Sequence, residues 1–141
     1  MLQKLWVGLI CGGLAACAVP SFMANPNFGA PPGDLRADRH ACNRTYPPRI
    51  GNYLPHAECV NAAVERDAIP TARYPDLVRL QEQLRVRYSA EIDRGTISPR
   101  AGERKMAEAD ELVEAAIRER DAGRMAAADH RVDRLEAMLQ R

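Results

Sequence analysis

The sequence predicts an all-α protein built around an antiparallel helical hairpin. Apolar residues recur at spacings of three and four along about the last seventy residues, which is the period of one helix face. Cap signals divide this pattern into helices joined by a tight turn. The chain has 141 residues, of which 5% are aromatic, so it is long enough for one small domain with a largely aliphatic core.

The first sixteen residues differ in composition from the rest of the chain. Lys4 precedes an uncharged run of twelve residues, 5–16. A membrane-spanning helix needs about 20 apolar residues, so this run is too short for a stable anchor. Residues 1–16 are therefore predicted to be an export signal that is removed from the mature protein.

The end of this segment, Leu14-Ala15-Ala16-Cys17, resembles the lipobox of bacterial lipoproteins. The resemblance covers only residues 1–17. It implies that the Cys17 thiol receives a diacylglyceryl group, that the chain is cut before Cys17, and that the new amino group is acylated. Because Ala18 rather than Asp follows, analogy with that family implies the periplasmic face of an outer membrane. Two or three acyl chains would hold the protein at the bilayer.

Three other interpretations of this segment remain open. An ordinary signal peptidase could cut at the A-x-A pattern of residues 16–18 and release a soluble exported protein. An apolar run extended to Val19 could remain as an uncleaved anchor. Cys11 and Cys17 could also be only small apolar members of the run.

Residues 17–33 are predicted to form a flexible tether. After Cys17 this stretch carries no charge and contains four prolines and two glycines, a composition that neither continues a helix nor joins a sheet. The folded part, residues 34–141, would then stand off the bilayer.

Cys42 and Cys59 are predicted to form a disulfide, because an exported protein meets an oxidising compartment. The intervening residues are rich in turn formers, so the bridge is expected to staple a loop between a short helix near 34–43 and a second helix. Pro55 suits the first turn of that second helix, and Pro70 ends it.

The same region allows a metal- or ligand-binding alternative. His40, Cys42, His56 and Cys59 supply two imidazoles and two thiolates, a donor set suited to tetrahedral zinc. Their spacing matches none of the common zinc motifs. A Cys-His hydrolase is a weaker alternative, because no Asn or Asp is placed in the sequence to orient either histidine.

The hairpin begins with a helix from residue 74 or 75 to 94. Leu77, Leu80, Leu84, Tyr88 and Ile92 form its apolar face, and Asp76–Arg79, Glu82–Arg85 and Glu91–Arg94 are predicted ion pairs on a solvated face. Gly95 supplies the carboxyl-terminal cap, and Ser98-Pro99 begins the next helix.

The last helix is expected to run from Pro99 almost to Arg141. Gly123 marks a kink or break within it. As one continuous helix it would be roughly 60 Å long, about twice the length of its partner. Leu135, Met138 and Leu139 would then need another surface, so they are predicted to bind the disulfide region, a second copy of the chain or another envelope protein.

Composition and motifs argue against nucleic-acid binding and catalysis. The formal net charge is +1, and the basic residues are interleaved with acids. No phosphate loop, nucleophile elbow or zinc-protease motif is present, and the acidic residues Glu108, Asp110, Glu111 and Glu114 fit a solvated helix surface. The sequence thus predicts a non-enzymatic envelope lipoprotein without a cofactor. Residues 51–63 and 74–77 resemble small alphaproteobacterial envelope proteins, a likeness that implies no activity.

Overall fold

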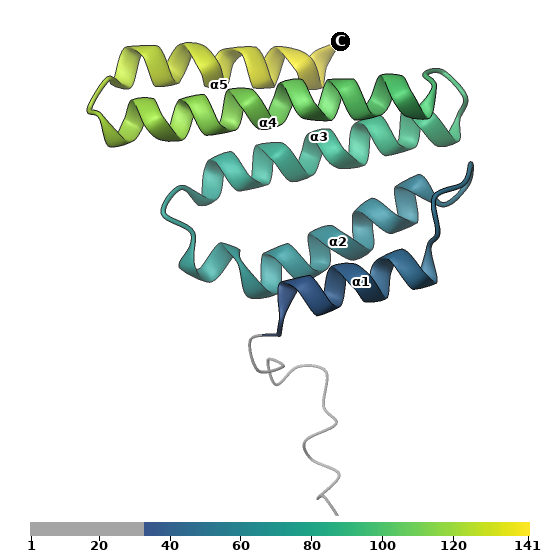
Figure 1. Ribbon diagram of the computed structural model, residues 1–141. Coiled ribbons are helices and arrows are strands. Elements are labelled where there is room, and N and C mark those ends of the chain that lie inside the picture. The colour runs from purple at the N-terminus through teal and green to yellow at the C-terminus, as the bar shows by residue number, and fades with distance from the viewer. Residues whose placement is uncertain (1–32) are drawn as a thin grey trace, which may run out of the picture. The chain divides into compact units, whose positions relative to one another are not determined.

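The computed structural model describes residues 33–141, which contain five α-helices and no strand. Each helix packs against the next one in the chain, and α5 also contacts α3 (Figure 1). The prediction of an all-α protein is confirmed. The helices are α1 (Leu35–Thr45), α2 (Tyr53–Asp67), α3 (Pro75–Asp93), α4 (Pro99–Asp121) and α5 (Met125–Gln140), with a 3-10 turn η2 (Ile69–Thr71) after α2.

Local cap signals account for the starts of three helices. The Asp34 side chain accepts a hydrogen bond from the backbone N–H of Arg36 at the start of α1, at 2.9 Å. Pro75 and Pro99 occupy the first positions of α3 and α4, where a missing N–H costs nothing. Ser98 Oγ accepts from the Ala101 N–H at 3.2 Å, so the predicted cap of α4 is confirmed.

The start of α2 is capped from a distant part of the chain. Its own N-cap residue, Asn52, makes no side-chain cap bond. Asp93, the last residue of α3, accepts instead: Oδ1 from the N–H groups of Gly51 at 2.6 Å and Tyr53 at 3.2 Å, and Oδ2 from that of Leu54 at 2.8 Å. A carboxylate at this end of a helix is stabilised by the helix dipole.

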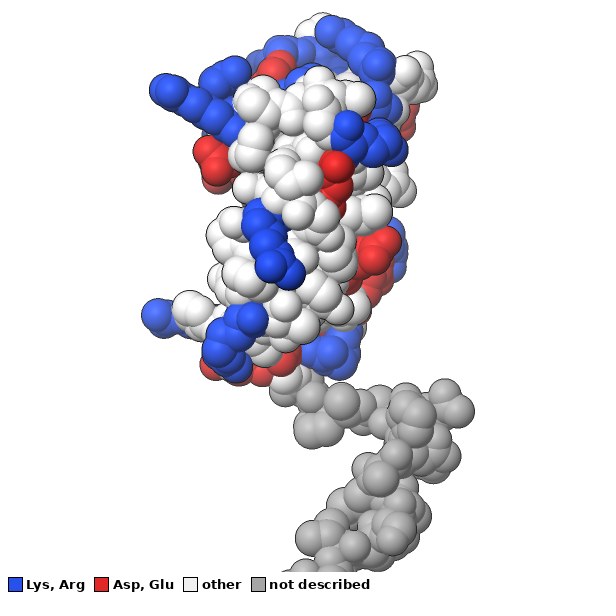
Figure 2. Space-filling view, turned by 90° about the vertical axis from the view of Figure 1, so that its right-hand side faces the viewer, with Lys and Arg blue, Asp and Glu red and all other residues white. Residues whose placement is uncertain are grey.

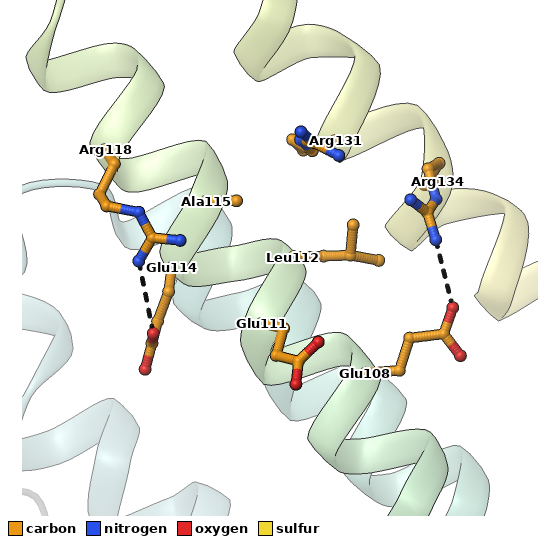
Figure 3. Close-up of a pocket in the computed structure, with 8 residues that line it drawn as sticks. All are labelled: Glu108, Glu111, Leu112, Glu114, Ala115, Arg118, Arg131 and Arg134. Atoms are coloured by element: carbon orange, nitrogen blue, oxygen red, sulfur yellow. Dashed lines mark hydrogen bonds and ion pairs between the residues drawn. The ribbon is translucent and has the colours of Figure 1, made fainter.

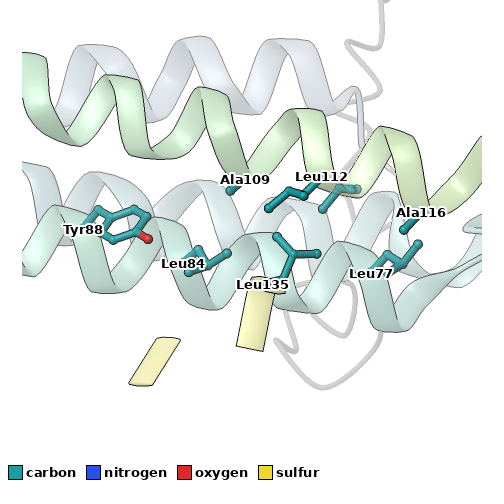
Figure 4. Packing of buried hydrophobic residues seen from close by; sticks show 8 residues of the cluster. Leu77, Leu84, Tyr88, Ala109, Leu112, Ala116 and Leu135 are labelled. Atoms are coloured by element: carbon teal, nitrogen blue, oxygen red, sulfur yellow. The ribbon is translucent and has the colours of Figure 1, made fainter. Parts of the chain in front are cut away.

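The main core lies between α3, α4 and α5 (Figure 4). A smaller cluster of Cys42, Val60 and Val64 joins α1 to α2. At the start of α4, a Cβ on Gly102 would lie 2.5 Å from Cδ1 of Ile92, so this glycine permits the close approach of α3 and α4. The buried residues of the main core are Leu77, Leu84, Tyr88, Ala109, Leu112, Val113, Ala116 and Leu135.

The expected long last helix is interrupted, and its second half folds back. α4 ends at Asp121, and Gly123 adopts a φ of +71°, a left-handed conformation that glycine enters without a Cβ penalty. The Arg124 N–H bonds the Glu119 carbonyl at 2.9 Å and closes the turn. The chain therefore reverses, and α5 lies against α3 and α4 (Figure 1).

This reversal gives Leu135, Met138 and Leu139, which were predicted to bind a partner, a packing surface within the same chain. Leu135 is fully buried, and Met138 and Leu139 pack against the same core. The Arg87 guanidinium also donates to the Leu139 carbonyl, which holds the end of α5 on α3. These residues need no second surface, because α5 covers the main core within one chain.

The predicted signal peptide, the lipidation residue Cys17 and the tether up to residue 32 lie outside the described residues. Within residues 33–141, no helix combines the length and the apolar character that crossing a membrane requires. On the face shown in Figure 2, basic and acidic side chains are interspersed among uncharged ones, as the sequence predicted.

Candidate functional site

The disulfide predicted from the sequence joins α1 to α2. Cys42 and Cys59 are bonded at an S–S distance of 2.06 Å, with their Cα atoms 5.8 Å apart. Cys42 is buried among Val60 and Val64. The bridge thus ties α1 to the one helix that it packs against among the described residues.

The same bond argues against the thiolate metal site. Both sulfurs are consumed by the disulfide, so neither can act as a thiolate ligand or as a nucleophile. His40 is exposed on α1, whereas His56 Nε2 lies 2.6 Å from Asn43 Oδ1. Over residues 33–141, no group of three or more His, Cys, Asp or Glu side chains is placed to hold a metal ion.

A cavity of about 380 Å³ lies beside the disulfide, and residues from four helices form its wall. We call it the four-helix cavity. Its volume falls in the range of small-molecule sites. It is lined by Arg39 and Asn43 of α1, His56 and Val60 of α2, Gln81 and Arg85 of α3, and Asp110 of α4.

Two guanidinium groups give this cavity its electrostatic character. Arg85 is half-buried, and its Nη1 donates to Oδ1 of Asn61, which is a neutral partner. Within the described part of the chain, neither Arg39 nor Arg85 forms an ion pair with a carboxylate. Burial, followed by the nearby charge of Arg39, lowers the pKa of Arg85.

The charge of Arg85 also affects the pKa of His56. This pKa lies below the ordinary value of 6.5, first because burial disfavours the imidazolium and then because Arg85 repels it. The imidazole is therefore neutral at pH 7. Its contact with Asn43 joins α2 to α1 at the cavity wall.

A second, smaller hollow of about 110 Å³ adjoins the first. Asn43 and His56 line both. Tyr46, Pro48, Asn52 and Tyr53, from the loop between α1 and α2 and the start of α2, complete its wall. This hollow offers ring surfaces, whereas the four-helix cavity offers charge.

Glu108, Glu111 and Glu114 of α4 belong to a different feature, a groove of about 370 Å³ against α5 (Figure 3). Two of its three arginines form ion pairs with its acids, Arg134 of α5 with Glu108 at 3.3 Å and Arg118 with Glu114 on the same helix at 3.5 Å. The predicted solvated surface is confirmed for Glu108, Glu111 and Glu114, which are exposed, but not for Asp110, which is half-buried in the wall of the four-helix cavity. Charges that neutralise each other across an open groove supply no acid–base chemistry.

Sequence reasoning missed Arg39, Arg85 and their neighbours because it treated one face of the hairpin as solvated. Glu82 and Arg85 were predicted to form an exposed pair. Glu82 is instead 5% exposed, its Oε1 has no hydrogen-bond partner within residues 33–141, and burial raises its pKa. The structure places α2 over this face of α3, and no signal local to α3 could have indicated that.

Comparison with known protein families, with characterised proteins and with solved structures finds no match to this chain. The class of this protein is therefore described from its fold and its candidate site. It is an all-α bundle with one disulfide among its described residues and an arginine-lined cavity beside that disulfide.

Proposed function

We propose that this protein is a lipid-anchored protein of the bacterial cell envelope that acts by binding rather than by catalysis. Its anchor would be the acylated Cys17, and residues 33–141 would be the water-exposed part. The lipobox-like sequence of residues 14–17 supports the anchor. The Cys42–Cys59 disulfide supports the location in the cell envelope, because disulfides persist in oxidising compartments such as the periplasm. That disulfide is the observation that carries the proposal.

The proposed location is the periplasmic face of an outer membrane. Ala18 after the lipidated cysteine favours it by analogy with bacterial lipoproteins. A tether over residues 17–33 would let the bundle reach a partner away from the bilayer surface. An envelope protein or a second copy of the chain is the proposed class of partner.

A binding role fits the chemistry of the cavity wall. Four of its seven lining residues are arginine, asparagine or glutamine, whose side chains donate hydrogen bonds and orient a ligand without exchanging protons with it near neutral pH. We propose a partner surface other than the stripe of Leu135, Met138 and Leu139, because Leu135 is buried and the other two pack against the main core. We place it on the polar outer surface.

Metabolic labelling with palmitate tests the anchor directly. The parent chain and the Cys11→Ser variant should both incorporate label, whereas Cys17→Ser should not. Cys11→Ser is the matched control because it removes a thiol from the same apolar run. Label that persists in Cys17→Ser, or a parent chain that carries no label, would contradict the proposal.

Intact-mass measurement under non-reducing conditions tests the compartment separately. The mature chain should be two protons lighter than its reduced form and should not react with a thiol-alkylating reagent until it is reduced. Free Cys42 and Cys59 in protein isolated from the cell envelope would count against an oxidising location.

A further inference from the structure

We propose that the four-helix cavity is a binding site for a small anion whose carboxylate or phosphate oxygens lie between the guanidinium groups of Arg39 and Arg85. This inference concerns residues 33–141 and does not depend on the lipid anchor. It names a ligand class for a cavity that the anchoring proposal leaves unassigned.

The first argument is the charge of the wall. Two arginines and one acid, Asp110, line the cavity. Asp110 Oδ1 already accepts a hydrogen bond from Gln81 Nε2 at 2.6 Å. Glu82, the other acid that acts on Arg85, lines a separate groove between α2 and α3 rather than this cavity. The cavity therefore has excess positive charge that an anion would neutralise.

The second argument is that the two arginines lack a charged partner. Eight of the eighteen arginines in residues 33–141 form ion pairs, for example Arg79 with Glu65 at 3.0 Å and Arg120 with Asp76 at 2.7 Å. Arg39 and Arg85 form none within residues 33–141, and Arg39 is one of the charges that disfavour the cationic form of Arg85. Holding two guanidinium groups around one cavity costs electrostatic energy that a bound anion would offset.

The third argument is that the disulfide fixes the geometry of the site. Arg39 precedes Cys42 by three residues on α1, and His56 precedes Cys59 by three residues on α2. Residues three apart lie on the same face of a helix, so the bridge is one turn away from both cavity residues. The bond thus prevents α1 from sliding along α2 and keeps Arg39 and His56 in register on the cavity wall.

The donor set indicates which anions fit. A guanidinium group donates two parallel hydrogen bonds to a carboxylate or a phosphate. Asn43 Oδ1 is used by His56, which leaves the Asn43 NH₂ group as a further donor on the wall. A volume of about 380 Å³ suits a small dicarboxylate or a phosphate compound, not a polymer.

Titration of the full chain by NMR tests the site, with inorganic phosphate and succinate as the two probes. The protein is labelled on histidine and on arginine side chains and purified in detergent. At least one probe should shift the signals of His56 and Arg85 with saturation, and it should raise the pKa of His56 because a bound anion offsets the charge of Arg85. Sodium chloride should weaken the effect.

Two variants and one control test whether Arg39 and Arg85 bind the probe. Arg39→Gln and Arg85→Gln should each weaken binding about tenfold or more, because each removes a charge-assisted contact. Arg36→Gln is the matched control: it makes the same change on α1, but Arg36 does not line the cavity. It should bind like the parent chain. Unchanged amide spectra would show that all three variants are folded.

The outcomes separate the ligand chemistries. Saturation by phosphate alone indicates a phosphate-bearing ligand, and saturation by succinate alone indicates a carboxylate; either supports the site. The proposal is overturned if neither probe shifts His56 or Arg85 at about 10 mM, well above a millimolar Kd. It is also overturned if Arg39→Gln and Arg85→Gln bind the probe as strongly as Arg36→Gln does.

Discussion

At the scale of single residues, Asp93 has the most specific structural role. Its carboxylate accepts three backbone N–H groups at the start of α2, although it belongs to the end of α3. It therefore accepts hydrogen bonds from the backbone N–H groups that the Asn52 side chain leaves uncapped, and it holds the end of α3 against the start of α2.

Replacing Asp93 with alanine should lower the free energy of unfolding by about 1–3 kcal/mol, because a charge-assisted cap is lost and the partly buried N–H groups of Tyr53 and Leu54 lose their acceptor. Urea unfolding followed by circular dichroism measures this change. Asp133→Ala, which removes the same charge from an exposed position on α5, should change it by about 0.5 kcal/mol at most. Equal effects of the two variants would show that Asp93 is not a cap.

The pKa of His56 makes stability depend on pH. Since folding lowers this pKa below 6.5, the unfolded chain binds the proton more tightly than the folded chain does. The contribution of His56 to stability is fully present above pH 6.5 and is lost as the pH falls through its folded pKa. Arg39, Arg85 and Asp110 are the charged groups that line the same cavity.

Arg85→Gln should therefore raise the pKa of His56 toward 6.5 and reduce the loss of stability on acidification. NMR titration of the imidazole measures the pKa, and urea unfolding between about pH 5 and pH 8 measures the linked stability. Arg36→Gln is again the control. A His56 pKa that stays the same in Arg85→Gln would show that burial alone accounts for the shift.

At the scale of elements, α1 depends on its disulfide. Among the described helices it packs against α2 alone, and its buried residue is Cys42. The main core, by contrast, holds α3, α4 and α5 together without it.

The double variant Cys42→Ser, Cys59→Ser should lose about 3 kcal/mol of stability, because the unfolded chain regains the entropy of an open loop. Hydrogen exchange should show that the amides of α1 lose protection first, while those of α3 and α4 stay protected. Uniform loss of protection through all the helices would contradict this separation. The parent chain treated with reductant should behave like the double variant.

Element positions were largely predictable, whereas ion-pair partners were not. The helix of residues 75–93 and the Ser98-Pro99 start follow from local signals, and the structure confirms them. The ion pairs expected within α3 do not form. Asp76 pairs with Arg120 and Arg79 with Glu65, because α4 and α2 bring closer partners to a helix that lies between them. Glu91 pairs with Arg87, one turn away on α3 itself.

At the scale of the whole molecule, the turn at Gly123 determines which apolar side chains remain exposed to solvent. It folds α5 over α3 and α4 (Figure 1), so a stripe that would have needed a partner packs against the core, where Leu135 is buried (Figure 4). Among the described residues, the large apolar side chains left exposed are Ile50 and Met125, which lie outside that stripe.

Leu135→Ala should consequently cost about 2–5 kcal/mol of stability through the cavity it leaves, without changing the oligomeric state. Urea unfolding measures the first effect, and light scattering coupled to size exclusion measures the second. Met125→Ala, at a side chain that is 53% exposed, should leave stability nearly unchanged. Loss of self-association with unchanged stability would instead support the binding role that the sequence predicted for Leu135.

The sequence by itself determined the helical class, the principal helix starts and the pairing of Cys42 with Cys59. Each depends on signals within a few residues, or on two cysteines that are the only ones in residues 33–141. Only the tertiary structure showed that the predicted last helix is divided into α4 and α5, and that α2 covers the charged face of α3. The same holds for the placement of Arg39 and Arg85 around one cavity. These features depend on contacts between residues far apart in the chain, whose energies no local pattern contains.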